Sequence, residues 1–114
     1  MISIKNLRHG QPSEPFDIKV DRSSILGNPY RMSKEWERAA VCCKYERYFN
    51  AMVNEDIEFL IQNNFDISKI KKFKSELDKL SKLFKKFGHL SLWCWCAPLQ
   101  CHAETIRNYL LIHY

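Results

Sequence analysis

The side chains best able to do chemistry are concentrated in one short segment, residues 92–102. Its reactive and aromatic residues are Trp93, Cys94, Trp95, Cys96, Cys101 and His102. Alternation along a strand would bring the first two sulfurs to one face and send both indoles to packing on the other. Pro98 then ends the strand, so the third cysteine and the histidine fall at the start of a helix. Because unpaired N–H groups and the helix dipole favour negative charge there, we expect a stabilised thiolate or a bound anion.

Zinc is one alternative for this segment. The order Cys-x-Cys-x4-Cys-His supplies the four soft ligands of a tetrahedral structural site. The spacing differs from the usual pair of Cys-x2–4-Cys knuckles, and neighbouring side chains on a helix point about 100° apart. The metal candidates are Cys94, Cys96, Cys101 and His102, with His9 or Cys42 available to complete a partial site.

A cysteine nucleophile is a second alternative. Cys101 is the better candidate for a lowered pKa, because the helix dipole and the adjacent His102 both favour its thiolate. Buried cysteines, however, are more often inert packing residues. The candidate catalytic residues, for covalent or acid–base chemistry, are His9, Cys101 and His102.

Composition limits the classes of protein to consider. With 114 residues, 46% of them hydrophobic, the chain fits one domain over residues 1–114. Its first residues are too polar for a signal peptide, and its apolar runs fall short of the roughly 20 residues of a membrane span. Five cysteines, two of them adjacent at Cys42 and Cys43, do not suit a secreted disulfide framework. We therefore expect a cytoplasmic protein with reduced thiols and no membrane partner.

The net charge of +5 belongs to one predicted helix. Between Lys69 and Lys86, eight lysines stand against Glu76 and Asp78, a local sum of +6, so the rest of the chain sums to −1. Such a face is most often a solvated surface, and a nucleic acid or an acidic protein is its candidate partner. The phenylalanines of this helix fall on its packing stripe, and no groove-reading motif accompanies the lysines.

Two strands and a structured loop are predicted ahead of the helices. Residues 2–6 and 16–20 alternate apolar and polar side chains, the pattern of strands with one buried face. Residues 21–30 form a long loop, in which Gly27 can take a positive φ. Asn28 is pushed toward extended geometry by the proline after it.

A helical insertion, residues 33–88, follows that loop. Ser33 is expected to cap a helix that runs to about Met52, whose packing stripe holds Trp36, Ala40, Cys43 and Arg47. A second helix starts near Asn54 and ends at residues 63–64. A third runs from Ser68 until Gly88 closes it, with an apolar stripe of Ile70, Phe73, Leu77, Leu80, Phe84 and Phe87.

A strand over residues 89–96 and a helix from residue 101 or 102 complete the predicted elements. The whole pattern indicates an α/β fold: a small, mostly parallel sheet flanked by helices, with the helical insertion between the second and the last strand. Ligands of such sheets collect at the carboxyl ends of the strands, where three predicted loops would meet. The candidate ligand-binding residues are Arg8, His9, Arg22, Gly27, Asn28, Tyr30, Cys96, Cys101 and His102.

Several of these residues, and Trp95, have expected roles at an anion or nucleotide site. Arg8 and Arg22 would neutralise phosphate, and Asn28 would set the position of a base or sugar. Tyr30 or Trp95 would stack on a base. The competing reading is that the arginine and the asparagine of the 21–30 loop only tie that loop down, as turn residues commonly do.

These motifs resemble an uncharacterised family of phages and bacteria, known as domain of unknown function four-three-two-six. The resemblance rests on Arg8-His9-Gly10, Arg22, Gly27-Asn28-Pro29-Tyr30 and the Cys-Trp-Cys-x-Pro-x-x-Cys-His block over residues 94–102. The chain departs from the family pattern at Asp21 and Ala103, where glycine is frequent. The resemblance implies an α/β fold and a phage or prophage setting, hence the cytoplasm of a host cell, and no established activity.

The function we expect is binding of a phosphorylated nucleotide-like ligand by a phage accessory protein. Such a protein would sequester or process a host-defence or metabolic nucleotide. One alternative is a hydrolase or glycosyl transferase acting on such a nucleotide, with His9 or His102 as acid or base. The other is a zinc-stabilised interaction protein, zinc being the one candidate cofactor.

Overall fold

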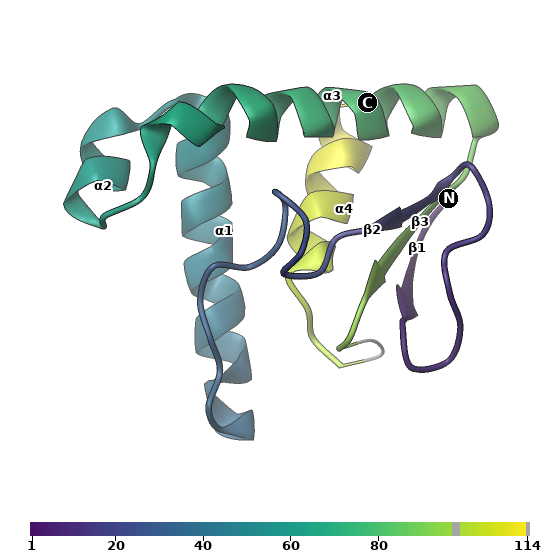
Figure 1. The fold of residues 1–114 in the computed structure, drawn as a ribbon, viewed down its shortest axis with the longest axis horizontal. Helices are drawn as coiled ribbons and strands as arrows, with labels where there is room; N and C mark the ends of the chain where they lie inside the picture. The colour runs from purple at the N-terminus through teal and green to yellow at the C-terminus, as the bar shows by residue number, and fades with distance from the viewer. Residues whose placement is uncertain (97–98, 114) are drawn as a thin grey trace.

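A small parallel sheet lies at the centre of the fold. The computed structural model describes residues 1–96 and 99–113. Three strands, β1 (Ile2–Asn6), β2 (Asp17–Lys19) and β3 (Leu90–Cys94), pair in the order β1-β3-β2, and both pairings are parallel. Helices pack around this sheet (Figure 1). The predicted α/β fold, with its helical insertion between the second and last strands, is confirmed.

Strand β3 is central, and each of its residues is buried. A continuous apolar run of this kind is typical of parallel sheets that are covered on both faces. Leu92 lies opposite Ile4 on one side and opposite Ile18 on the other. The strand ends at Cys94, two residues before the predicted end, and Trp95 and Cys96 form a bend. The prediction that Pro98 ends the strand lies outside the described residues.

The helical elements of the described chain are four α-helices and two 3-10 turns. They are η1 (Glu35–Glu37), α1 (Arg38–Asn54), α2 (Ile57–Gln62), η2 (Ile67–Lys69), α3 (Ile70–Phe87) and α4 (Ala103–His113). In Figure 1, α1 and α4 stand beside each other, and α3 crosses above them and the sheet. Within the described residues, none of these helices has the length and apolarity that crossing a membrane requires.

The first helix differs from its prediction in start and in packing stripe. Ser33 is no N-cap: its hydroxyl donates to Glu37 Oε1 at 2.6 Å, ahead of the 3-10 turn that precedes α1. Trp36 lies on that turn and is 78% exposed. The buried residues of α1 are Val41, Tyr45, Tyr48, Phe49, Ala51 and Met52, of which Phe49 was expected beside the packing stripe. The correction has a physical reason, because the three aromatic rings bury more apolar area than the alanine and cysteine positions expected to face inward.

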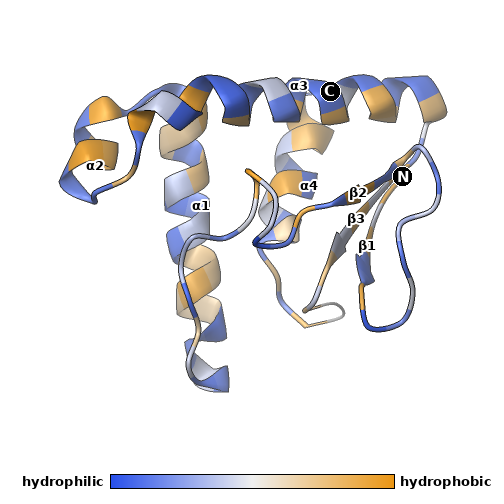
Figure 2. Ribbon diagram, in the orientation of Figure 1, coloured by the Kyte–Doolittle hydropathy of each residue, from blue (hydrophilic) through white to orange (hydrophobic). Residues whose placement is uncertain are grey.

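The other helix ends follow capping chemistry. Asp56, not Asn54, caps α2, since its Oδ1 accepts from Phe59 N at 3.2 Å. Gly88 closes α3 with φ 66°, as predicted. The predicted stripe of α3 is buried except for Phe87, which is 38% exposed. Figure 2 shows the apolar residues of this helix turned toward the sheet and α4, and the polar ones turned away.

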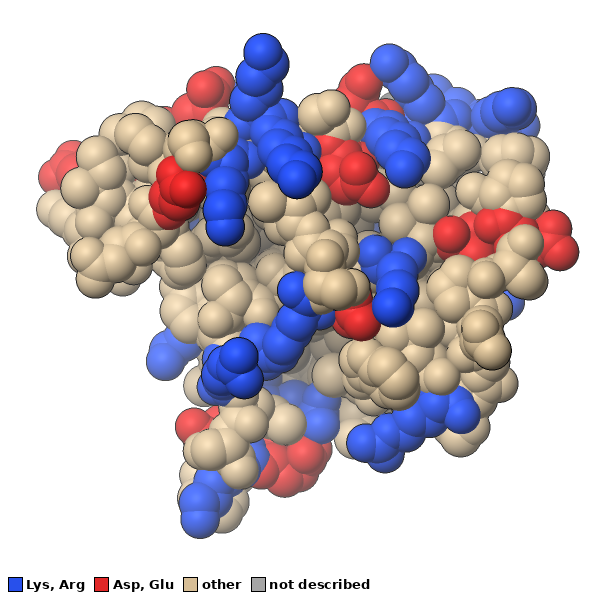
Figure 3. Space-filling view, viewed as in Figure 1, with Lys and Arg blue, Asp and Glu red and all other residues tan. Residues whose placement is uncertain are grey.

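The lysine face of α3 is interrupted by acidic side chains. Figure 3 shows Lys and Arg gathered along α3 with Asp and Glu among them. Lys74 Nζ lies 3.1 Å from Glu55 Oε2, and Lys82 Nζ lies 2.9 Å from Asp78 Oδ2. These exposed pairs lower the local charge that would attract a polyanion. A nucleic-acid or acidic-protein partner for this helix stays a prediction.

Candidate functional site

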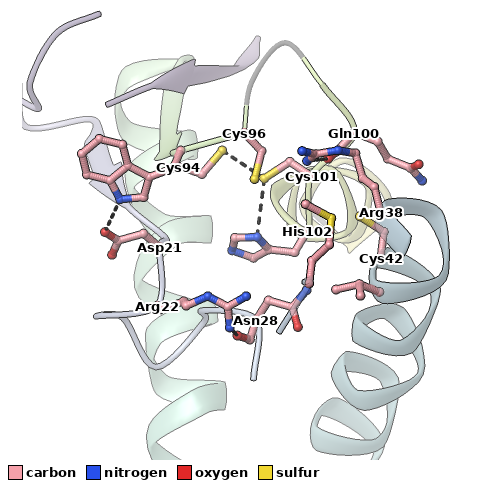
Figure 4. A pocket seen from close by; sticks show the side chains of 13 residues that line it. Asp21, Arg22, Asn28, Arg38, Cys42, Cys94, Cys96, Gln100, Cys101 and His102 are labelled. Carbon is pink, nitrogen blue, oxygen red and sulfur yellow. Dashed lines mark hydrogen bonds between the residues drawn. The ribbon is translucent and has the colours of Figure 1, made fainter. Parts of the chain in front are cut away.

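A pocket of about 230 Å³ lies at the carboxyl end of β3. Four segments enclose it: the loop after β2, the first turns of α1, the end of β3 and the residues before α4. Figure 4 shows their side chains converging. The lining residues are Asp21, Arg22, Asn28, Met32, Arg38, Val41, Cys42, Cys94, Trp95, Cys96, Gln100, Cys101 and His102. Five of the nine candidate ligand-binding residues are in this set, as expected where the carboxyl ends of parallel strands meet, and their role in binding stays a prediction.

The other four candidates do not line the pocket: Arg8, His9, Gly27 and Tyr30. The loop after β1 does reach the same edge, because Leu7 N donates to Cys94 O at 2.8 Å. However, β1 and β2 flank β3 on opposite sides, and the pocket is built from the loop after β2. Arg8 and His9 are exposed. Of the two residues considered for completing a partial zinc site, His9 is therefore not in the pocket lining, whereas Cys42 is there with Cys94, Cys96 and Cys101.

Arg22 holds the loop after β2 together. Its Nη1 donates to Asn28 O and its Nη2 to Tyr30 O, both at 2.7 Å. The Asn28 side chain accepts from Tyr30 N at 2.9 Å, a local turn bond of the kind expected of asparagine before proline. Arg22 and Asn28 therefore do hold the loop of residues 21–30 together, as the structural alternative predicts. Both of these acceptors are neutral carbonyls, and in the described part of the chain no carboxylate lies within 4 Å of the Arg22 guanidinium.

The two aromatic candidates for stacking are in different environments. Tyr30 packs edge-on against Phe65, with ring centroids 5.9 Å apart, and is not among the residues that line the pocket. Trp95 lines the pocket and is 52% exposed, whereas Trp93 is 7% exposed. The expectation that both indoles enter packing is thus wrong for Trp95. Strand β3 ends one residue before it, so the alternation of faces stops there.

Asp21 orients the Trp95 ring. Trp95 Nε1 donates to Asp21 Oδ2 at 3.2 Å, and Ser23 donates to Asp21 Oδ1 through both its backbone N–H and its hydroxyl. Burial alone would raise the pKa of Asp21, but the hydrogen bonds from Ser23 and Trp95 outweigh it and hold this pKa below its usual value. The carboxylate is therefore charged, and the indole has a fixed position at the pocket rim.

Acid should weaken the fold partly through Asp21. Its pKa is lower in the folded than in the unfolded chain, so the stability it contributes is present above its ordinary pKa of about 4 and is lost as the pH falls through the folded value. We expect Asp21→Asn to cost about 1–3 kcal/mol at pH 7 and to flatten the decline below pH 4. Urea unfolding between pH 3 and 7 measures this. Asp78→Asn, at an exposed carboxylate of α3, is the control, and an unchanged slope in Asp21→Asn would contradict the assignment.

Three cysteine sulfurs meet in this pocket. Cys101 Sγ lies 3.0 Å from Cys94 Sγ, and Figure 4 shows Cys96 beside them. Hydrogen bonds from the Cys101 and Cys94 thiols, with the Arg38 guanidinium, hold the pKa of Cys96 far below its usual value. The bonds to Cys94 and Cys96, with burial, raise the pKa of Cys101. The prediction of Cys101 as the low-pKa cysteine is therefore wrong, and Cys96 takes that place.

The start of α4 explains why Cys101 does not become the thiolate. The helix begins at Ala103, and Cys101 N donates to the Glu104 carboxylate at 3.1 Å. A negative side chain of the chain itself thus occupies a donor that was expected to stabilise a thiolate or an anion. An anion in the pocket would need other partners.

His102 is a buried, neutral group in the pocket wall. Its Nε2 contacts the backbone oxygen of Val20, and because a carbonyl only accepts, Nε2 carries the proton. Burial lowers the pKa of His102, so the ring is uncharged. Its unprotonated Nδ1 lies 3.5 Å from Cys101 Sγ, and Tyr45 packs edge-on at 5.0 Å between ring centroids. Both ring nitrogens therefore face partners within the protein.

Arg38 is a pocket residue that sequence reasoning missed. Its Nε and Nη2 donate to the two carboxylate oxygens of Glu35 at 2.7 and 3.0 Å, and its Nη1 donates to Gln100 O at 3.0 Å. The Glu35 carboxylate, followed by Cys96, raises the pKa of Arg38. Its position depends on how α1 packs beside the segment before α4. The available sequence signal was only the Glu-x-x-Arg spacing of residues 35 and 38.

The described residues do not form a metal site: among them, no group of three or more His, Cys, Asp or Glu side chains is arranged to hold an ion. The 3.0 Å between Cys94 Sγ and Cys101 Sγ is also shorter than the about 3.8 Å that separates two thiolates around tetrahedral zinc with bonds of about 2.3 Å. The short sulfur–sulfur contact is that of a hydrogen bond between thiols, and none of the five cysteines is joined in a disulfide.

One comparison with known proteins gives a match. A family model described as "Domain of unknown function (DUF4326)" matches residues 4–111, nearly the whole chain. No curated protein and no solved structure matches. The match spans every segment that lines the pocket.

Proposed function

The chain belongs to the DUF4326 family, and we propose, from the pocket, that it binds a phosphorylated nucleotide-like ligand. One observation carries this proposal. Arg22 lines the pocket, is fixed by two backbone carbonyls, and has no carboxylate within 4 Å among the described residues. A preorganised guanidinium without a neutralising partner is the group that a phosphate recognises through charge-assisted hydrogen bonds.

The size of the pocket limits how such a ligand sits. At about 230 Å³ it is smaller than the roughly 300–1,000 Å³ of sites that enclose a whole drug-sized molecule. It therefore encloses one part of a nucleotide. We place the phosphate against Arg22, which is exposed at the mouth, and a base on the half-exposed ring of Trp95, which Asp21 holds in position. Stacking on such a ring contributes about 1–3 kcal/mol per base.

The biological setting is part of the same proposal. The protein acts as a phage-encoded accessory protein in the host cytoplasm, where it sequesters or processes a host-defence or metabolic nucleotide. Because both ring nitrogens of His102 have protein partners and His9 lies outside the pocket, binding is better supported than hydrolysis or glycosyl transfer. The arrangement of the cysteines likewise favours binding over a zinc-stabilised interaction protein.

Arg22→Ala should weaken ligand binding at least tenfold. A tenfold loss of affinity corresponds to about 1.4 kcal/mol, and removing one charge-assisted hydrogen bond costs at least that much. The measurement is isothermal titration of the purified protein with adenosine and guanosine mono-, di- and triphosphates, a cyclic nucleotide and ADP-ribose. Arg31→Ala, an exposed arginine that does not line the pocket, is the matched control and should bind as the wild type does.

A second variant distinguishes a direct loss of ligand contacts from disorder of the loop after β2, which Arg22 holds together. Trp95→Ala keeps the bonds of Arg22 to the loop and should still weaken binding, by the stacking contribution. Thermal unfolding of each variant shows whether the fold is intact. Absence of saturable binding across the whole panel, or equal affinity of wild type and Arg22→Ala, would overturn the proposal.

A further inference from the structure

The three cysteines of the sulfur cluster, Cys94, Cys96 and Cys101, differ in how accessible they are from the pocket. Cys94 and Cys101 are buried, with 1% and 3% of their surface exposed, whereas Cys96 is half-buried and lines the pocket. Of these three sulfurs, a molecule that enters the pocket therefore reaches that of Cys96 first. Cys101, whose Sγ lies 3.0 Å from Cys94 Sγ, is the more deeply buried neighbour of Cys96 (Figure 4).

The groups around Cys96 favour its thiolate. The sulfurs of Cys94 and Cys101 lie beside it in the pocket (Figure 4), and Arg38 supplies a positive charge that is itself held in place by Glu35 and by Gln100 O. Donors and a nearby cation are the features that distinguish reactive cysteines from inert buried ones. Cys43, by contrast, is exposed on α1 and does not line the pocket. The chain thus carries one cysteine in an activating environment and another that is merely accessible.

We propose that this pocket is a thiol–disulfide exchange site, in which Cys96 attacks a low-molecular-weight disulfide and Cys101 resolves the product. In the first step, the Cys96 thiolate attacks one sulfur of the disulfide R–S–S–R. A Cys96–S–S–R bond forms, the original S–S bond breaks, and R–S⁻ leaves. This inference goes beyond nucleotide binding and does not depend on it.

The second step closes an internal disulfide. The R–S⁻ released in the first step takes the Cys101 proton. The Cys101 sulfur then attacks the Cys96 sulfur of the mixed disulfide, an S–S bond forms between the two cysteines, the bond from Cys96 to the R–S group breaks, and the second R–S⁻ leaves and takes up the proton that Cys96 had lost to solvent. In sum, two protein thiols are oxidised to one Cys96–Cys101 disulfide, and R–S–S–R is reduced to two thiols.

Oxidised glutathione is the probe for this site. After incubation of the reduced, full-length protein at pH 7, mass spectrometry should show a form two hydrogens lighter, and peptide mapping should join Cys96 to Cys101. Cys101→Ser should stop at a glutathione adduct on Cys96. Cys96→Ser should slow the reaction at least tenfold, whereas Cys43→Ser should react as the wild type does.

Substitution of Arg38 changes the pH dependence of the reaction rate, an effect that a folding defect would not produce. Arg38→Gln should slow the first step several-fold and move the rate profile to higher pH, while Arg38→Lys should restore much of the rate at pH 7. Circular dichroism verifies that each variant is folded. An unchanged rate in a folded Cys96→Ser, or glutathione adducts on Cys43 with no internal disulfide, would overturn the proposal.

Discussion

Gly27→Ala should destabilise the chain by about 3 kcal/mol and collapse the ligand pocket. A Cβ at this position would lie inside contact distance of the Asp21 carbonyl oxygen and 2.8 Å from Arg22 Cα. Both obstacles are backbone atoms, which cannot move aside as the end of a side chain can. Because Asp21 and Arg22 line the pocket, the same shift would displace the phosphate-binding guanidinium. Urea unfolding and nucleotide titration of the variant measure the two effects.

Gly10→Ala is the matched control for this substitution. A Cβ at Gly10 would meet the Trp93 ring at 3.2 Å, a contact that a shift of a few tenths of an ångström in that side chain relieves. We expect it to cost less than about 1 kcal/mol and to leave nucleotide binding intact. Equal stability of the two variants would contradict the close approach that the structure assigns to Gly27.

Leu92→Ala should cost roughly 2–5 kcal/mol, the range for truncating a fully buried leucine. Leu92 has no exposed surface and lies at the middle of the central strand, between Ile4 and Ile18 of its neighbours. The loss combines the transfer of buried methyl groups with the cavity they leave. Because β3 ends at Cys94, a loosened strand would also disorder the sulfur cluster. The midpoint of urea unfolding, and the rate of reaction with oxidised glutathione, report both consequences.

Leu111→Ala is the control for Leu92→Ala. This leucine, on α4, is 52% exposed, so its truncation should change stability by no more than about 0.5 kcal/mol. If the two variants unfolded at the same urea concentration, β3 would not be the centre of the core.

Much of the fold was predictable because its signals are local. The apolar stripe of α3 and the closing glycine Gly88 need only helical periodicity and the tolerance of glycine for positive φ. The small α/β sheet was predicted from two early strands, a helical insertion and a last strand that leads into a helix. The convergence of Arg22, Cys96 and His102 followed from the meeting of carboxyl ends in such a sheet.

The parts that were missed depend on tertiary contacts. Gly27 does not take the positive φ expected of it; glycine is needed there because the loop folds back onto its own backbone. Arg38 reaches the pocket through the packing of α1, and Glu104 blocks an N–H group at the start of α4. The pKa order of Cys96 and Cys101 reflects the hydrogen bonding among the three sulfurs, with burial and Arg38 next, and spacing along the chain does not encode these contacts.

Titration of ¹⁵N-labelled protein with the same nucleotide panel, followed through the tryptophan indole Nε1–H resonances, tests the pocket most directly. The chain has three tryptophans, and Trp95 alone among them lines the pocket, with Nε1 bonded to Asp21. We predict a saturable shift of the Trp95 resonance by a phosphorylated nucleotide, with the exposed Trp36 unmoved and the effect lost in Arg22→Ala. A Trp95 resonance that stays fixed across the entire panel would contradict a nucleotide-binding pocket at this edge of the sheet.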